Sequence, residues 1–106
     1  MDILERIDLI DDFCKYIHNI NKVISNYFSV YLFGSILKTD AKPKDIDVLI
    51  VYTYYDRSEI IRWEDLLYSY GNFIGLPVDC TILSKEEVMD TKFIERINAF
   101  RIIKKK

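Results

Sequence analysis

The sequence contains one histidine, His18, and two cysteines, Cys14 and Cys80, that stand far apart. A single histidine excludes a zinc site built from several histidines, and a Ser-His-Asp arrangement would depend on that residue alone. The separated cysteines lack metal-ligand spacing, so we interpret them as buried thiols rather than a disulfide or a metal site. His18 flanks an apolar helical stripe and is expected to be an ordinary surface or boundary residue.

The sequence also lacks any apolar run that approaches the ~20 residues needed to cross a bilayer. Its first residues, MDILERID, are acidic and amphipathic, without the basic start and apolar block of a signal peptide. We therefore expect a cytoplasmic protein with no membrane partner. The net charge is −2 and both signs are mixed, which gives no general attraction to polyanions, so nucleic acid is not the expected partner.

What the sequence does contain is apolar material for one core, since 50% of its 106 residues are hydrophobic and 14% are aromatic. This amount fits one domain over residues 1–106 and leaves little for a second. Aromatic side chains crowd one stretch: Tyr52, Tyr54, Tyr55, Trp63, Tyr68 and Tyr70. Either they fill the core or some of them form a contact patch, and the second interpretation predicts a homo- or hetero-oligomer.

Periodicity predicts two long helices. The first covers residues 2 to about 27, and one stripe runs along it at three- and four-residue steps: Ile3, Ile7, Ile10, Cys14, Ile17 and Ile24. The second covers residues 57 to about 72, with glycines at its end (Gly71, Gly75) and a buried side made of Ile60, Ile61, Leu66, Leu67 and Tyr70. Capping pairs are expected at the starts: Asp2 with Glu5, and Asp56 with Glu59.

Strands are predicted between and after these helices. Residues 29–33 and 77–83 are β-branched and aromatic runs, and 45–52 becomes apolar on both faces, which marks an interior strand. Residues 36–44 suggest a turn or short helix followed by a loop. A capping box from Ser84 to Glu87 predicts a helical turn, followed by a helix over 93–99 and an edge strand over 100–103. Helices that alternate with strands predict an α/β (α+β) fold, a sheet covered by helices.

Three aspartates are the candidates for chemistry. Asp45 and Asp47 open a strand and project to the same face, roughly 6 to 7 Å apart at the backbone. Asp79 lies in the following strand, flanked by apolar residues that suggest partial burial, and joins the pair if the two strands are neighbours. Carboxylates that converge repel one another, and hard divalent cations relieve that repulsion. The three therefore form a predicted catalytic metal site for phosphoryl displacement.

A glycine and a serine follow the first strand directly. Gly34 lets the backbone approach a ligand closely, and the Ser35 hydroxyl adds a donor, so this turn can hold the phosphates of a nucleoside triphosphate. Lys38, one turn further on, is placed to reach the same phosphates. Each feature alone is common in ordinary turns and strand ends; the order of Gly-Ser, Asp-x-Asp and a third Asp on a later strand is what favours catalysis over a non-catalytic relic.

These residues resemble the polymerase-β nucleotidyltransferase superfamily, and most closely its minimal nucleotidyltransferases. The resemblance rests on LFGSILKTDAKPKDIDVLIVY, residues 32–52, and on LPVDCTIL, residues 76–83. It implies a small mixed sheet flanked by helices, ATP or another nucleoside triphosphate as donor, and Mg²⁺ or Mn²⁺ as metal. Members of this branch often pair with a small helical toxin of the HEPN type, either by adding AMP to a toxin tyrosine or by binding it.

The sequence departs from that family pattern in one segment. The family's usual run after Gly-Ser is basic, commonly Arg-Ala-Arg-Gly, whereas here it is Ile36-Leu37-Lys38-Thr39. No substrate-binding domain follows either, so little surface is expected for a polynucleotide. Three functions stay open: an enzyme that adds AMP to a protein hydroxyl, an antitoxin or binding module with little or no catalysis, and a small-molecule nucleotidyltransferase completed by oligomerisation.

Overall fold

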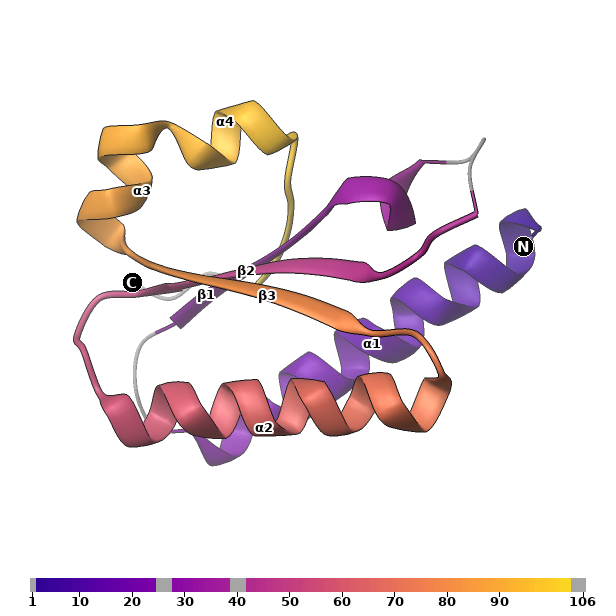
Figure 1. Ribbon diagram of the computed structural model, residues 1–106, viewed down its shortest axis with the longest axis horizontal. Helices are drawn as coiled ribbons and strands as arrows, with labels where there is room; N and C mark the ends of the chain where they lie inside the picture. The colour runs from indigo at the N-terminus through magenta and orange to yellow at the C-terminus, as the bar shows by residue number, and fades with distance from the viewer. Residues whose placement is uncertain (1, 25–27, 39–41, 104–106) are drawn as a thin grey trace.

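The computed structural model describes residues 2–24, 28–38 and 42–103 (Figure 1). The elements follow in the order α1 (Ile3–Val23), β1 (Phe28–Phe33), the 3₁₀-helix η1 (Gly34–Leu37), β2 (Ile46–Tyr52), α2 (Arg57–Ile74), β3 (Val78–Ser84), α3 (Lys85–Thr91), α4 (Phe93–Ile97) and β4 (Phe100–Ile103). The strands form one mixed sheet in the order β3-β2-β1-β4. The predicted fold class, a small mixed sheet flanked by helices, is confirmed.

The position of each strand in the sheet follows its sequence. β2 pairs with β1 on one side and β3 on the other, antiparallel and parallel respectively, as expected of a strand that is apolar on both faces. β4 pairs with β1 alone and is the predicted edge strand. The parallel pairing of β2 and β3 is made by the α2 crossover, because parallel neighbours need a long connection.

Helices cover both faces of the sheet (Figure 1). α1 and α2 lie on one face, where they enclose the main core with alternate strand residues such as Val30, Val48 and Ile50. α3 and α4 lie on the other face, over a smaller core that contains Leu49 and Val51. Residues of β2 therefore alternate between two cores, and Asp47 belongs to the α3–α4 face together with Leu49 and Val51.

Side-chain caps begin three of the helices where the sequence predicts them. Asp2 Oδ1 accepts from the Glu5 N–H at 2.8 Å, and Asp56 Oδ1 accepts from the Glu59 N–H at 3.2 Å. Ser84 and Glu87 form the reciprocal capping box at the start of α3. Among the described residues, no helix combines the length and apolar character that spanning a bilayer requires.

The buried face of α1 differs from the predicted stripe. Ile3 and Ile7 are 56% and 51% exposed, whereas Arg6 is buried, in line with Phe13, Ile17 and Ile20 further along the helix. The first turns of α1 extend past the strands, where the helix meets η1 rather than the apolar sheet (Figure 1). Helix α1 ends at Val23; residues 25–27 of the predicted helix lie outside the described residues.

Other helix boundaries also differ from the prediction. α2 continues to Ile74 and ends at Gly75, whose φ of 74° is left-handed. Gly71 lies inside the helix, where the packing is tight: a Cβ there would lie 3.0 Å from the Leu76 carbonyl oxygen. Ile61, expected on the buried side of α2, is exposed and is replaced there by Trp63. The 3₁₀-helix begins already at Gly34, and α4 ends at Ile97 because Asn98 turns left-handed.

Candidate functional site

The structure brings the three predicted aspartates together at one end of β2 and β3. Asp47 and Asp79 are direct register partners on these parallel neighbours, and Asp45 immediately precedes β2. Each of the three offers a carboxylate oxygen, and these oxygens all lie within 4.8 Å of one another. The prediction that Asp79 meets the Asp45–Asp47 pair therefore holds in the geometry of the sheet.

The electrostatics of this cluster centre on Asp47. Its pKa is raised from 3.8 to about 6, first by burial and then by the nearby charges of Asp45 and Asp79, with a further contribution from a side-chain hydrogen bond to Asp45. The raised pKa reflects first the cost of burying the charge of Asp47 and then its repulsion by the neighbouring carboxylates. A set of oxygen donors in mutual repulsion is chemically suited to a hard divalent cation such as Mg²⁺ or Mn²⁺. The three residues therefore fit the metal that the sequence predicts.

Asp79 is exposed, in contrast to the partial burial expected from its apolar neighbours along β3. The α3–α4 pair packs against Leu83 and does not cover Asp79. Because its carboxylate is hydrated by solvent, Asp79 can stand in this strand without a buried polar partner. Its exposure leaves one side of the cluster open to solvent.

Gly34 abuts the cluster directly. Its φ of 81° is left-handed, and a Cβ at this position would overlap Asp47 Oδ2 and lie 2.9 Å from Asp47 Cγ. Both the backbone conformation and the contact require glycine. The pairing of Phe33 with Asp47 across β1 and β2 explains this contact, because it places the residue after Phe33 beside the carboxylate.

A buried arginine that sequence reasoning missed holds the Gly-Ser turn. Arg6 is 4% exposed, and its Nη1 donates to the carbonyl oxygens of Ser35 at 2.8 Å and of Ile36 at 3.0 Å. The Ser35 carbonyl also accepts from the Lys38 N–H at 3.1 Å. The detectable signal was the position of Arg6 seven residues before Phe13, in line with the apolar face of α1.

A cavity of about 540 Å³ lies beside this turn. Its lining comes from η1 and the residue before it, and from the end of α4: Phe33, Gly34, Leu37, Lys38, Arg96, Ile97 and Asn98. Lys38 lines this cavity together with Gly34, and its predicted contact with phosphate stays a prediction. Ser35 does not line this cavity, and Ile36 is buried in the main core. Arg96 and Asn98 were not predicted, since no local pattern ties residue 96 to residue 34.

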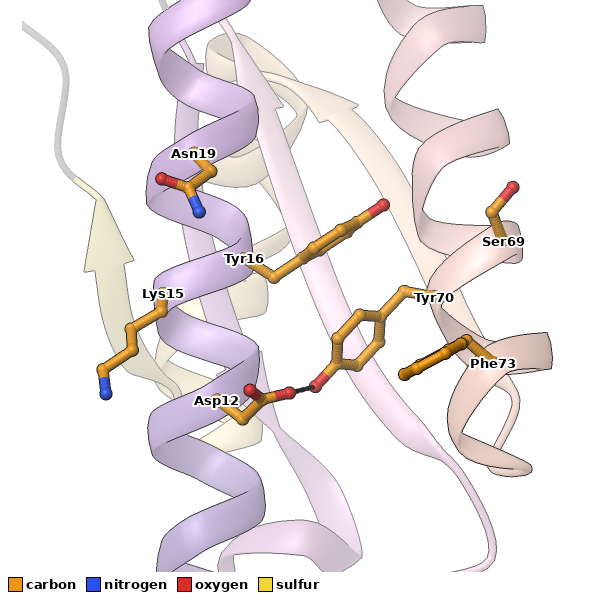
Figure 2. A pocket seen from close by; sticks show the side chains of 7 residues that line it. All are labelled: Asp12, Lys15, Tyr16, Asn19, Ser69, Tyr70 and Phe73. Atoms are coloured by element: carbon orange, nitrogen blue, oxygen red, sulfur yellow. Dashed lines mark hydrogen bonds between the residues drawn. The ribbon is translucent and has the colours of Figure 1, made fainter.

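A second cavity, of about 650 Å³, opens on the opposite side of the sheet, between α1 and α2 (Figure 2). Its walls carry Tyr16 and Tyr70, whose rings lie 4.5 Å apart, and Tyr70 Oη donates to Asp12 Oδ2 at 2.6 Å. Burial, followed by this hydrogen bond, raises the pKa of Tyr70 well above its usual range. Because the aspartate cluster is on the other face, this cavity is not part of the candidate metal site.

Part of the crowded aromatic stretch fills the core and part of it is exposed. Trp63 and Tyr70 are buried in the main core, whereas Tyr54, Tyr55 and Tyr68 are exposed. His18 is exposed, as expected, and both cysteines are free and partly buried. Burial raises the pKa of the Cys80 thiol to about 12, so this thiol stays protonated at neutral pH.

Comparison with known proteins identifies the family. Residues 2–102 match the family of unknown function DUF6932. The chain belongs to this family. No curated protein matches it. This chain is similar to a candidate nucleotidyltransferase from Sulfolobus solfataricus whose crystal structure is known, with a TM-score of 0.59 and 21% sequence identity. The match covers 93% of this chain and 83% of that one. This DUF6932 protein therefore has a nucleotidyltransferase-like fold.

Proposed function

We propose that this protein is a divalent-metal-dependent nucleotidyltransferase. The observation that carries the proposal is the convergence of Asp45, Asp47 and Asp79, with carboxylate oxygens within 4.8 Å of one another, against a glycine turn that has no room for a side chain. The likeness to a candidate nucleotidyltransferase supports the same fold. An acidic cluster built for an ion, beside a backbone turn, suits phosphoryl chemistry, which needs position and positive charge more than covalent help.

Each part of the site has a distinct task in this proposal. Asp45, Asp47 and Asp79 would hold Mg²⁺ or Mn²⁺, which when bound supplies the positive charge that stabilises phosphoryl transfer. Asp79 is the most exposed of the three and is placed to accept the proton of an incoming hydroxyl. Gly34 and Lys38 line the cavity beside the cluster and would contact the phosphates of the donor there, with the neighbouring Ser35 as a further donor from the same turn.

The donor and acceptor in this proposal follow the sequence resemblance to minimal nucleotidyltransferases. The donor is ATP and the transferred group is AMP. The acceptor is a hydroxyl on a partner protein, a tyrosine of a HEPN-type toxin. The exposure of Asp79 leaves one side of the cluster open, which supports a macromolecular acceptor.

A second candidate, a binding module with little or no catalysis, is favoured by two observations. Ile36, where the resembling family commonly carries a basic residue, is 1% exposed in the core, so this position offers no charge to phosphate. Tyr54 and Tyr55 are exposed just after β2 and would suit a protein contact. A third candidate, transfer to a small molecule, would require the acceptor site to be completed by another subunit.

Transfer of label tests these candidates. The protein is purified with its native partner and incubated with α-labelled ATP and Mg²⁺, and intact mass is measured on the partner. We expect a mass increase of AMP, which is lost in the Asp45→Asn, Asp47→Asn variant and retained in Asp65→Asn, an exposed position on α2. If the double variant still neutralises its partner fully and wild type transfers no label, the binding module is correct. Label found on a metabolite instead would establish the third candidate.

A further inference from the structure

The cavity beside Gly34 joins two segments that are distant in the sequence. Gly34, Leu37 and Lys38 come from the Gly-Ser turn, while Arg96, Ile97 and Asn98 come from the end of α4. Gly34 contacts the aspartate cluster on one side and lines this cavity on the other. The cavity is therefore adjacent to the candidate metal site, because Gly34 lines the cavity and also lies against Asp47.

The charges in the cavity are of one sign. Of the described residues that line it, Lys38 and Arg96 are cationic and none is acidic. This contrasts with the three carboxylates on the far side of Gly34. An arginine guanidinium presents several N–H donors in a planar fork that matches phosphate, and a lysine adds a compact charge. A volume of about 540 Å³ is in the range of small-ligand sites.

Packing of its neighbours holds the backbone of α4 at this place, while the Arg96 side chain itself is exposed. Phe93 and Ile97, on either side of Arg96 in α4, both pack against the smaller core. The ring of Phe93 meets that of Phe33 edge to face, with centroids 5.9 Å apart, and Phe33 itself lines the cavity. Asn98 then takes a left-handed conformation and turns the chain into β4, which pairs with β1. The short helix is therefore anchored at both ends beside the Gly-Ser turn.

We propose that Arg96 is the second cation of a polyphosphate subsite in this cavity, where it binds the terminal phosphates of the donor nucleotide together with Lys38. The proposal rests on the proposed nucleotidyltransferase function. Ile36 is uncharged and buried, so it contributes nothing to the cavity. The turn contributes the cation of Lys38, and α4 contributes that of Arg96. Arg96 is thus a substrate-binding residue that the motif around Gly34 does not contain.

Calorimetric titration with MgATP and with AMP tests the role of Arg96. We expect Arg96→Ala to weaken MgATP binding about tenfold or more, since charge-assisted hydrogen bonds to phosphate are lost. AMP, which lacks the terminal phosphates, should bind the variant and wild type alike. Arg96→Lys should recover part of the loss. The matched control is Arg62→Ala, an exposed arginine on α2 that does not line the cavity, and it should leave both affinities unchanged.

The outcomes separate the two proposals. If Arg96→Ala binds MgATP as tightly as wild type, while the Asp45→Asn, Asp47→Asn variant loses label transfer, the polyphosphate subsite is wrong and the enzyme stands. An equal loss of affinity for AMP and ATP would also overturn the subsite, because it would place Arg96 elsewhere on the nucleotide. If wild type binds neither nucleotide, the proposed function itself fails.

Discussion

Asp47 is the residue on which the electrostatics of the site act most strongly. Its pKa of about 6, against an ordinary 3.8, means that the folded protein binds this proton more tightly than the unfolded chain does. Protonation therefore favours the fold. The resulting stability is fully present below pH 3.8 and is lost as the pH rises through about 6, where Asp47 ionises beside Asp45 and Asp79.

We expect Asp47→Asn to stabilise the protein at neutral pH when EDTA is present, because the substitution removes one of the repelling charges. The gain should be on the order of 1 kcal/mol, after allowing for solvent screening of a partly exposed group. Urea denaturation at pH 7.5 measures it, and at pH 4 the difference from wild type should shrink. Mg²⁺ should stabilise wild type more than the variant. If the variant is less stable than wild type in EDTA, the negative charge of Asp47 does not destabilise the metal-free fold.

At the scale of single residues, the aspartates and Lys38 could be found from the sequence, whereas Arg6 and Arg96 could not. Alternation along a strand places Asp45 and Asp47 on one face without any tertiary information. Asp79 needed one further assumption, that β2 and β3 are neighbours, which the α2 crossover satisfies. Arg6, which donates to the Ser35 carbonyl, lies 29 positions from it along the chain, and Arg96, which lines the same cavity as Gly34, lies 62 positions from Gly34. No local pattern encodes such separations.

Among the elements, the contact between α1 and η1 determines how firmly the Gly-Ser turn is held. Arg6→Ala removes two charged hydrogen bonds and leaves the Ile36 carbonyl buried without that donor. We expect a loss of about 2–4 kcal/mol in the free energy of unfolding, measured by urea denaturation. MgATP affinity should also fall at a temperature where the variant remains folded, because the turn is less well positioned.

Two variants show whether this effect is specific. Arg6→Lys keeps a charge and should recover part of the stability and of the MgATP affinity. Lys15→Ala, an exposed position on the same helix, should change neither quantity. If Arg6→Ala loses stability but binds MgATP as wild type does, Arg6 stabilises α1 without positioning the turn.

The helices also show where periodicity stops being informative. Ile3 and Ile7 continue the three- and four-residue spacing of the α1 stripe, yet both are exposed. Spacing records which residues share a face, but the partner of that face changes from sheet to η1 along the helix. Gly71 is a similar case: it resembles a helix end in the sequence, whereas it is a close-packing position against Leu76 and Val78. Caps were predicted more reliably, because they depend on residues three positions apart.

For the whole molecule, the sheet separates two faces with different tasks. The aspartates and Arg96 lie on the α3–α4 side. The cavity with Tyr16 and Tyr70 lies between α1 and α2 (Figure 2). Tyr70→Phe removes the hydrogen bond to Asp12 while keeping the ring contacts with Phe13 and Tyr16. We expect a loss of about 1 kcal/mol in stability, because the exposed Asp12 can bind water instead.

This separation predicts that the two faces behave independently. Tyr70→Phe should leave MgATP affinity unchanged, whereas Asp47→Asn should reduce it. In the double variant, the two changes in unfolding free energy measured in EDTA should add to within about 0.5 kcal/mol, since the residues share no partner. Urea denaturation of the four proteins in the cycle gives the coupling energy. A coupling energy well above that figure, or a loss of nucleotide binding in Tyr70→Phe alone, would show that the α1–α2 face and the metal site are energetically coupled.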